Sequence, residues 1–334
     1  MIQTTTQGEI AVFFTGGTIG MAPAEGMPGV APGGNFHKLL NQLAPQRPGV
    51  TLRPVAWSDK PSPHMTPADM LGLAREVEAA LARPETLGAV ILHGTDVLVE
   101  TAYLCDMVID SDKPVILTGS MRYYSESGYD GIRNLINAVR ACLLPLPPGT
   151  GACVLMTDRL FAAREAVKVN SLNVDAFESR EGGIVGYVAG ESVILADRAL
   201  AHTPRRKLQP ANMAANVPLL TAFTGMDRSL VDHVRIKGIQ GLVVEGFGAG
   251  NVPPAIVPAL VECLDQGIPV VLATRCIEGG VWPIYGYPGG GADLAQRGII
   301  LCGRLGGPKA RLRLICALGT TRDPEAIRAL FDDA

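Results

Sequence analysis

The chain has 334 residues, of which 47% are hydrophobic and 18% charged, and its formal net charge is −3 at pH 7. This length suits two domains better than one core, and the apolar content excludes a disordered chain. The nearly balanced charge, with no block of basic residues, argues against nucleic acid or an anionic membrane as a partner.

Short apolar segments recur along the chain, and each ends in small or polar residues. Because these segments are apolar without interruption, they predict strands that are buried on both faces, as in a parallel sheet. In chain order they are residues 10–14, 89–92, 115–118, 153–156, 241–244, 270–273 and 299–301.

Helical patterns fill the gaps between the first of these strands. Residues 67–82, 98–109 and 131–143 each place apolar side chains on one face. Pro67 suits the first turn of the first helix, where its missing N–H costs nothing. Strands that alternate with helices predict the α/β class, with a parallel sheet of the flavodoxin or Rossmann kind.

The region 198–218 breaks this alternation, because it is polar, basic and contains prolines. Such a stretch is typical of an interdomain linker. It divides the chain into a larger N-terminal α/β domain, residues 1–197, and a smaller C-terminal α/β domain, residues 219–334. The larger domain is expected to be catalytic.

The N-terminal residues, MIQTTTQGEI, show neither the basic start nor the apolar core of a signal peptide. No apolar run reaches the roughly 18–20 residues of a membrane-spanning helix. A cytoplasmic location is therefore expected, with the seven cysteines as reduced, buried thiols. The five histidines lack metal-ligand spacing, so we expect no metal site.

Polar residues follow the first predicted strand, in the stretch TGGT at 15–18. In open parallel sheets, ligands bind beyond the carboxyl ends of the strands. Glycines at this edge leave N–H groups that can hold a carboxylate or a developing oxyanion. The spacing Gly16-Gly17-x-x-Gly20 differs from the dinucleotide pattern GxGxxG, which disfavours nucleotide binding. A purely structural tight turn is the other alternative.

A second polar stretch, HGTD at 93–96, follows the second strand. Taken alone, Thr95 or Asp96 fits the N-cap of the next helix, which is worth about 1 kcal/mol. Two such stretches at one edge favour a site instead. Lys168 lies between two valines; a lone lysine is usually solvated, but in a partly dry pocket it can assist deprotonation of a neighbouring hydroxyl.

Together these stretches resemble the bacterial-type L-asparaginase family of amidohydrolases, and its type I cytoplasmic members most closely. The resemblance spans nearly the whole chain. It is carried by FTGGTIGM at 14–21, ILHGTD at 91–96, ETAY at 100–103, KPVILTGSMR at 113–122, DGIRNLINAVRA at 130–141, AREAVKVNSLNVDAFES at 163–179, GFGAGNVP at 246–253 and GPKARLRLICAL at 307–318.

This resemblance implies a two-domain asparaginase-like fold and homodimers or homotetramers with active sites at the dimer contact. It implies no metal or organic cofactor, and a small amide as the binding partner. The implied reaction hydrolyses the side-chain amide of L-asparagine, or of a close small amide, to the acid and ammonia through a threonine acyl-enzyme.

The resemblance also assigns roles to particular residues. Thr18 is the implied nucleophile, and Thr95 is the second catalytic hydroxyl. Lys168 is implied to support Thr95, and Asp96 to bind the substrate α-amino group. The implied substrate-binding set is Gly17, Ser62, Gly94, Thr95, Asp96 and Asn251, with Ser62 binding the α-carboxylate and Asn251 contributed across the dimer contact.

Three departures from the family pattern bear on function. Family members place a tyrosine in the mobile loop after TGGTI, where it activates the nucleophile; here Met27 takes that place and residues 21–34 contain no tyrosine. Val97 replaces the threonine that usually follows HGTD, which costs a hydrogen bond at the helix start. Pro63 replaces a glutamine or serine that often contacts substrate, and removes an N–H donor.

Another residue must then assist the nucleophile, or the chemistry has changed. Tyr123 and Tyr124 follow a third strand and are candidates, with ordinary packing or exposed tyrosines as the alternative. The missing tyrosine leaves two other functions open: hydrolysis of a different amide, such as an N-substituted asparagine or a D-amino-acid amide, or a catalytically weak member that binds an acidic amino acid. A lysine-supported threonine argues against the second, because a binding protein does not need one.

Overall fold

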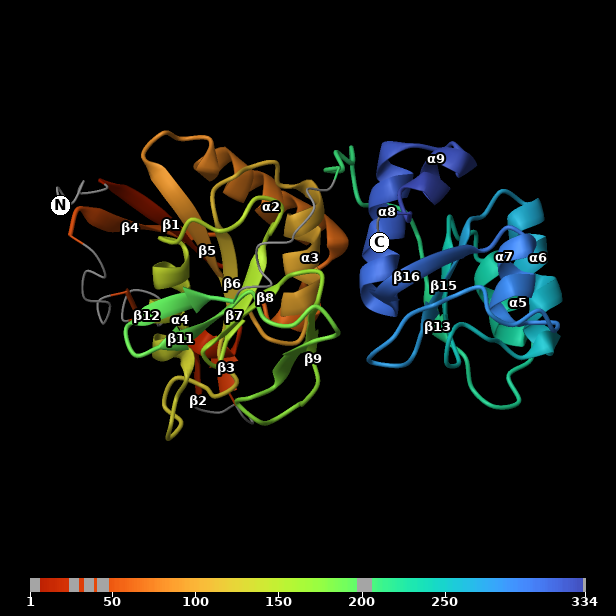
Figure 1. Cartoon of the computed structure of the whole chain (residues 1–334), viewed down its shortest axis with the longest axis horizontal. Coiled ribbons are helices and arrows are strands. Elements are labelled where there is room, and N and C mark those ends of the chain that lie inside the picture. Colours follow the sequence, from red (N-terminus) through yellow and green to blue (C-terminus); the bar gives the residue numbers. More distant parts are fainter. Residues whose placement is uncertain (1–6, 24–29, 33–38, 41–47, 197–205, 333–334) are drawn as a thin grey trace. The chain divides into compact units, whose positions relative to one another are not determined.

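The computed structural model describes residues 7–23, 30–32, 39–40, 48–196 and 206–332. The chain separates into two compact units, unit 1 (Met1–Lys207) and unit 2 (Leu208–Ala334), shown in Figure 1. The division falls inside the predicted linker, residues 198–218, of which 198–205 lie outside the described residues.

Unit 1 is built on a twisted central sheet. Within its described residues the sheet has eight strands in the order β12-β11-β8-β7-β6-β5-β1-β4. The strands are β1 (Gly8–Phe14), β4 (Val50–Ala56), β5 (Thr86–Leu92), β6 (Val115–Thr118), β7 (Cys153–Met156), β8 (Arg159–Ala162), β11 (Gly186–Ala189) and β12 (Ser192–Leu195). β4, β1, β5, β6 and β7 are parallel, so their carboxyl ends share one edge.

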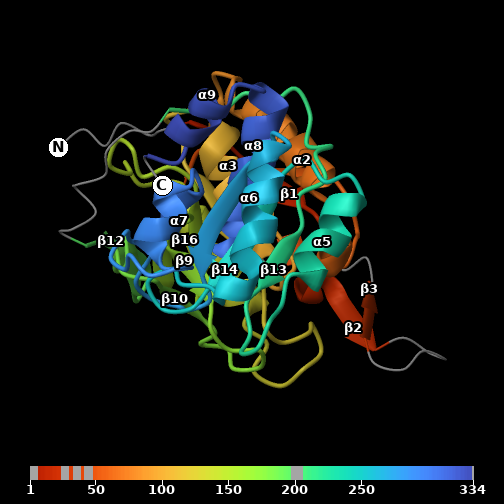
Figure 2. The same cartoon turned by 90° about the vertical axis from the view of Figure 1, so that its right-hand side faces the viewer.

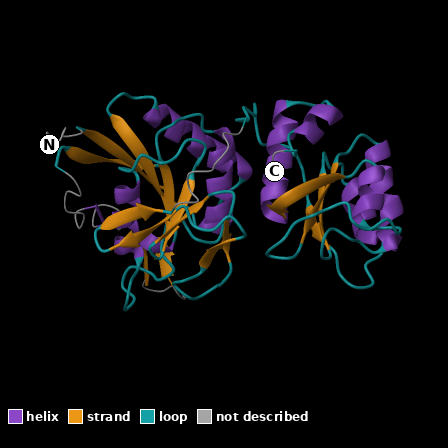
Figure 3. Cartoon of the chain, in the orientation of Figure 1, coloured by secondary structure: helices purple, strands orange, loops and turns teal. Residues whose placement is uncertain are grey.

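Helices cover both faces of this sheet (Figure 3). α2 (Pro67–Leu81) and α3 (Leu98–Val108) pack against each other and against β5 and β6, whereas α4 (Gly131–Ala141) packs on the other face. α2 begins at a capping box, in which Thr66 accepts from the Asp69 N–H and Asp69 accepts from the Thr66 N–H. Under α4 lies a buried cluster that includes apolar side chains of β1, β5, β6 and β7.

The sheet of unit 1 is mixed, although the apolar runs predicted a parallel sheet. After β7 the chain turns back at once through Thr157 and Asp158, whose φ angles are 46° and 64°. Two residues with positive φ form the tight turn whose twist suits a hairpin, so β8 pairs antiparallel with β7. β11 and β12 then extend the sheet, also antiparallel.

Two smaller pairs of strands lie outside the central sheet of unit 1. β2 (Met21–Pro23) pairs antiparallel with β3 (Val30–Pro32), directly after the predicted TGGT turn. β9 (Ala166–Lys168) pairs antiparallel with β10 (Phe177–Ser179), so that Lys168 lies opposite Phe177. Each pair fixes the backbone next to a predicted site residue.

Unit 2 is a smaller three-layer α/β structure. Its described residues form a parallel sheet in the order β13-β14-β15-β16, with bounds β13 (Leu219–Thr221), β14 (Leu242–Gly246), β15 (Val270–Thr274) and β16 (Ile300–Gly306). α8 (Gly307–Thr320) covers one face, and α9 (Pro324–Ala329) packs against α8. Figure 2 views the opposite face, with α5 (Ser229–Ile236), α6 (Val257–Asp265) and α7 (Gly291–Gln296) in front of the strands.

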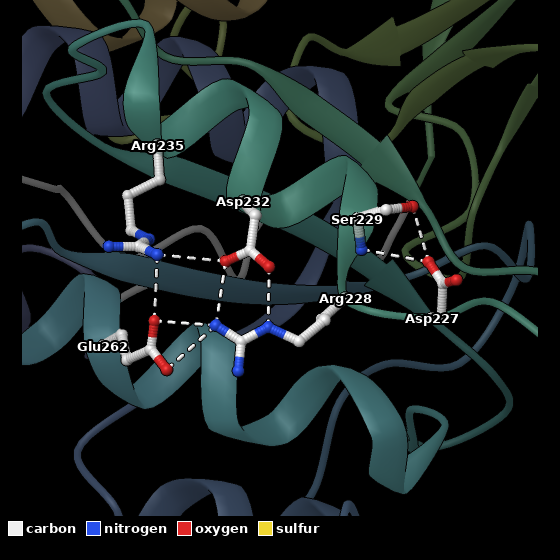
Figure 4. Close-up of polar contacts among 6 residues, drawn as sticks. All are labelled: Asp227, Arg228, Ser229, Asp232, Arg235 and Glu262. Carbon is white, nitrogen blue, oxygen red and sulfur yellow. Dashed lines mark hydrogen bonds and ion pairs between the residues drawn. The ribbon is translucent and has the colours of Figure 1, made fainter.

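A cluster of four charged side chains joins α5 to α6 (Figure 4). Arg228 donates to Asp232 at 2.6 Å and is 2.8 Å from Glu262, and Arg235 contacts the same two carboxylates at 3.0 and 2.9 Å. Hydrogen bonds from Arg228 and then Arg235 lower the pKa of Asp232 to about 2. Asp232 therefore stays ionised above that pH, although solvent screening keeps the cluster's contribution to stability small.

The predicted α/β class and the three predicted helices are confirmed. Each of the seven predicted strands is present, β6 and β7 with the predicted bounds and the other five with shifted ends. None of the helices in the described ranges is both long and apolar enough to cross a membrane. None of the seven cysteines, all of which lie in described residues, forms a disulfide; six are buried, as expected, whereas Cys276 is exposed.

Candidate active site

The turn that follows β1 touches the turn that follows β5. Gly16 and Gly17 have φ angles of 97° and 92°, which only glycine adopts readily. A Cβ atom on Gly17 would lie 2.4 Å from the Cα of Gly94, so the two backbones are in direct contact. Since consecutive Cα atoms are about 3.8 Å apart, this contact brings the Cα atoms of Thr18 and Thr95 within about 12 Å.

Thr15 anchors the turn after β1 to the end of β5. Its backbone N–H and its hydroxyl both donate to the carbonyl of Leu92, at 3.1 and 3.0 Å. The neighbouring Ser58 hydroxyl donates to the Thr15 carbonyl at 2.9 Å. The turn is thereby held at the carboxyl edge of the parallel strands, where the strand pattern predicted the site.

Ser62 joins the same contact from a short 3-10 helix, η2 (Ser62–His64). A Cβ atom on Gly94 would lie 2.6 Å from the Oγ of Ser62, and Ser62 is only 4% exposed. The structure therefore brings Gly17, Gly94 and Ser62 together. Pro63 follows in the same 3-10 helix and is exposed.

Lys168 reaches across to the Thr-Asp pair. Its Nζ donates to the Oγ1 of Thr95 at 3.0 Å and lies 2.9 Å from the Oδ1 of Asp96. The Lys168 side chain is 17% exposed and Thr95 is 5% exposed, whereas the Asp96 side chain is 59% exposed. The ammonium thus lies between a buried hydroxyl and a carboxylate that faces solvent, so the solvated-surface alternative for Lys168 does not hold.

Thr95 and Asp96 do not cap the helix that follows them. The N-cap residue of α3 is Val97, and no side-chain hydrogen bond caps this helix. The capping alternative for the Thr-Asp pair is therefore wrong. Both side chains are instead directed to Lys168, and the start of α3 lacks the hydrogen bond that a hydroxyl at position 97 would provide.

His93, two residues before Thr95, is fully buried, and the sequence reasoning gave it no role. Its Nδ1 lies 2.8 Å from the carbonyl of Gly94, and its Nε2 lies 3.0 Å from the hydroxyl of Thr101. Burial lowers the pKa of His93 to about 4, so the ring is neutral at pH 7. Nδ1 then donates to the Gly94 carbonyl and Nε2 accepts from Thr101, which fixes the backbone that carries Thr95.

Thr18 begins a 3-10 turn, η1 (Thr18–Gly20), and is half-buried. The hydroxyl of Tyr129 donates to the carbonyl of Ile19 at 2.7 Å, and the backbone N–H of Tyr124 donates to the carbonyl of Met21 at 3.1 Å. Tyr129 is the tyrosine that contacts this turn through its side chain, and the sequence reasoning did not predict it. Met27 lies outside the described residues.

Of the two tyrosines that the sequence suggested, Tyr124 packs against the core cluster under α4, with its ring edge-to-face on Tyr129 at 5.5 Å between centroids. Tyr123 is half-buried, and its backbone N–H faces Glu126 at 3.4 Å. The packing alternative therefore describes the Tyr124 ring, and the Tyr124 backbone N–H contacts Met21, directly after the Thr18 turn.

Asn251 belongs to unit 2, in the turn after β14. Phe247 and Asn251 form an isolated bridge, with backbone hydrogen bonds of 2.7 and 2.9 Å. The side-chain Oδ1 of Asn251 is buried and accepts no hydrogen bond from the described residues. Across the described ranges, no group of three or more His, Cys, Asp or Glu side chains is arranged to hold a metal ion.

Comparison with known families gives matches over most of the chain. The family model "Asparaginase, N-terminal" matches residues 9–200, and the model "Glutaminase/Asparaginase C-terminal domain" matches residues 216–331.

Individual proteins match over similar lengths. A "Probable L-asparaginase" from Deinococcus radiodurans is 36% identical over 329 residues, covering 96% of each chain. An "L-asparaginase" from Bacillus licheniformis is 30% identical over 94% of this chain and 97% of that protein. A crystal structure described as "Probable Cytoplasmic L-asparaginase from Campylobacter jejuni" has a TM-score of 0.84 at 30% identity, covering 97% of this chain and 99% of that one.

Proposed function

Since the chain belongs to the asparaginase family of amidohydrolases, we propose that it hydrolyses the side-chain amide of L-asparagine to aspartate and ammonia. The family and the two-domain fold predicted from the sequence are confirmed by matches to both domains and by the solved neighbour. The proposal places the reaction in unit 1, at the carboxyl edge of its parallel strands.

One observation carries this proposal. The Lys168 ammonium donates to the hydroxyl of Thr95 at 3.0 Å while it pairs with Asp96. Thr95 directly follows Gly94, which is in contact with Gly17. A protein that only binds an amino acid needs no buried hydroxyl held by an ammonium. A hydrolase does, because a proton must move between nucleophile and leaving group.

In the proposed reaction, Thr18 Oγ1 attacks the amide carbon. The C–N bond then breaks, and the leaving amine takes the proton that the Thr18 hydroxyl loses, which gives ammonia and a threonyl ester. The Thr95 hydroxyl, oriented by Lys168, passes this proton. Water then attacks the ester and returns a proton to Thr18, and backbone N–H groups of the glycine turn face the developing oxyanion.

The proposed substrate contacts follow from charge and burial. The exposed carboxylate of Asp96 suits the α-ammonium group of an amino acid, and the buried Ser62 hydroxyl suits its α-carboxylate. These two contacts would orient asparagine with its side-chain amide toward Thr18. An amide without a free α-amino group would lose the Asp96 contact.

The proposal is tested by measuring ammonia release from L-asparagine. We expect Thr18→Ala and Thr95→Ala each to lower kcat by about a thousandfold or more, whereas Thr18→Ser and Thr95→Ser keep a hydroxyl and part of the activity. Thr51→Ala, on the exposed side of β4, is the matched control and should match the wild type. Full activity in Thr18→Ala would refute the nucleophile assignment.

A small panel of amides separates the alternatives. Turnover of N-substituted asparagine or of D-amino-acid amides, with no turnover of L-asparagine, would mean that the enzyme catalyses the same type of reaction on a different substrate. Aspartate binding without turnover of any amide would indicate a binding protein instead.

We also propose a cytoplasmic homodimer or homotetramer, without a metal or organic cofactor, in which Asn251 of a partner copy completes the site. The Campylobacter jejuni neighbour is described as cytoplasmic, and the Oδ1 of Asn251 is buried without a partner among the described residues. Light scattering coupled to gel filtration would give the molecular mass and therefore the number of copies in the assembly. We expect Asn251→Ala to raise KM without lowering the molecular mass of the assembly. Activity should survive dialysis against EDTA, because no metal is proposed to take part.

A further inference from the structure

We propose that Tyr129 is the positioning residue for the Thr18 turn: its hydroxyl, donated to the carbonyl of Ile19, holds the nucleophile in its reactive place. This inference rests on the proposed function for its catalytic consequence. The contact itself stands independently, at 2.7 Å between residues that are 110 positions apart.

Two hydrogen bonds from one loop hold the Thr18 turn and the residue that follows it. The Tyr129 hydroxyl reaches the Ile19 carbonyl, and the Tyr124 backbone N–H reaches the Met21 carbonyl at 3.1 Å. Within the turn, the Gly20 N–H donates back to the Gly17 carbonyl at 3.1 Å. Thr18 therefore lies in a turn that is fixed at both ends.

The loop that supplies these bonds is itself firmly built. The Asp130 carboxylate accepts from the N–H groups of Met121 and Arg122, both at 3.0 Å, and from the side-chain amide of Asn134 at 3.0 Å. The Arg122 guanidinium donates to the carbonyl of Gly128 at 2.9 Å. This loop, residues 121–130, is hydrogen-bonded to the first turns of α4, so the position of Tyr129 is fixed. The hydrogen bond from Tyr129 then fixes the position of the turn that carries the nucleophile.

The Tyr129 ring fits a slot that leaves little freedom. A Cβ atom on Gly131 would lie 2.2 Å from the Tyr129 hydroxyl oxygen, and the Tyr124 ring packs edge-to-face against it. Burial, followed by the charge of Asp130 and by Tyr124, raises the pKa of Tyr129 far above its usual value. The hydroxyl therefore stays protonated and acts as a donor, which gives it a positioning role rather than that of a base.

The consequence for catalysis follows from the distance tolerance of nucleophilic attack. A displacement of about 1 Å in a reacting atom can cost a factor of about 100 in rate. Losing the Tyr129 hydrogen bond frees the Ile19 carbonyl and lets the η1 turn shift. Because substrate is proposed to bind through Asp96 and Ser62, the loss should appear in kcat and not in KM.

The test is Tyr129→Phe, which removes one oxygen and keeps the ring in its slot. We expect kcat for L-asparagine to fall about tenfold, with KM within a factor of about two, because one hydrogen bond is lost and substrate contacts are kept. Tyr187→Phe is the matched control, since Tyr187 is 42% exposed on β11, and should equal the wild type. Gly131→Ala should act like Tyr129→Phe, because a Cβ there displaces the ring.

A second measurement tests the hydrogen bond between Tyr129 and Ile19 without an activity assay. In Tyr129→Phe, hydrogen exchange should speed up at the amides of Gly20 and Tyr124 and stay unchanged in α2. Unchanged exchange at these amides, or an unchanged kcat, would overturn the proposal, as would a loss confined to KM. If the wild type hydrolyses no amide, the proposed function fails, while hydrogen exchange still decides whether Tyr129 holds the turn.

Discussion

At the residue scale, the site depends on two glycines whose backbones touch. Gly17 and Gly94 come from turns 77 positions apart, and neither has room for a methyl group. Gly17 also has a φ of 92°, where a side chain is strained. The close approach of two chain segments, and not flexibility, explains glycine at these positions.

Gly17→Ala should therefore disrupt both stability and activity. A Cβ atom 2.4 Å from the Gly94 Cα must push the two turns apart, in addition to a backbone strain of about 1–3 kcal/mol. We expect a lower urea midpoint and loss of ammonia release. Gly20→Ala is the control three residues away, because a Cβ there meets no atom within 4 Å. Equal midpoints for the two variants would contradict the contact.

Lys168 provides a second residue-scale prediction. Lys168→Met keeps the length and apolar stem of the side chain but removes the ammonium that orients Thr95. We expect kcat to fall by about 10²–10⁴, the usual contribution of a proton-transfer group. Lys168→Arg should not restore the rate, because a planar guanidinium does not replace a compact ammonium between Thr95 and Asp96.

The control for Lys168→Met is Lys237→Met, an exposed lysine that follows α5. It should leave kcat and KM unchanged. A wild-type rate in Lys168→Met would show that the hydrogen bond to Thr95 is structural only.

How far the sequence predicted the site depends on the kind of residue. The glycine turn and the Thr-Asp pair could be predicted, because both follow apolar strands. The contact between Lys168 and Thr95 could not be derived from spacing, since 73 positions separate them. The residue types suggested a lysine beside a hydroxyl, and the family resemblance assigned that hydroxyl to Thr95. Tyr129 and His93 were missed because their role is to hold carbonyl groups, and no sequence pattern marks such a contact.

At the element scale, strands with an uninterrupted apolar run were predictable, whereas half-exposed strands and strands of three residues were not. β6 and β7 were predicted to the residue, because an uninterrupted apolar run marks a strand covered on both faces. β4 was missed because it lies at the edge of the sheet, with Thr51, Pro54 and Ala56 exposed and its other side chains only half-buried. β9 and β10 have three residues each, too few for any periodicity.

The start of α3 allows an element-scale prediction. Val97 occupies the N-cap and provides no hydrogen bond to the first turn. Val97→Thr keeps the β-branched shape and adds a hydroxyl that can accept from an N–H of the first turn, so we expect a gain of about 0.5–1 kcal/mol in the free energy of unfolding. Urea titration measures it.

Val99→Thr makes the same chemical change two residues later, inside the helix. The free N–H groups of the first turn are capped by the side chain of the N-cap residue and not by that of the second helical residue, so stability should fall or stay the same. If both variants gain equally, the gain does not come from capping.

At the scale of the whole molecule, the candidate site lies at an edge where separate segments of unit 1 meet. The turns after β1 and β5, the 3-10 helix at Ser62, the β9 strand and the loop before α4 all contribute, and none forms the site alone. His93 is completely buried and neutral. The stability of the molecule therefore depends on pH through a residue that does not touch the substrate in the proposed mechanism.

The sign of that dependence follows from the two pKa values of His93. The unfolded histidine titrates near 6.5, whereas the folded one titrates at about 4, so between these values the unfolded chain binds more protons. Stability is then full above pH 6.5 and falls as the pH drops toward 4. For a single group with these pKa values, the loss between pH 7 and pH 5 is about 2 kcal/mol.

Urea unfolding at pH 7 and pH 5 tests this loss in unit 1. Trp57 and Trp282 are the two tryptophans, one in each unit, so a Trp282→Phe background makes fluorescence report on unit 1 alone. In this background His93→Gln should lose about 2 kcal/mol less than the parent between the two pH values, even if it is less stable at both, because glutamine cannot take up the proton. His233→Gln, at an exposed position of α5, should keep the parent's dependence. The same change with pH in His93→Gln and in the parent would place the acid sensitivity elsewhere, in which case the buried ring would not be the group that couples protonation to the fold.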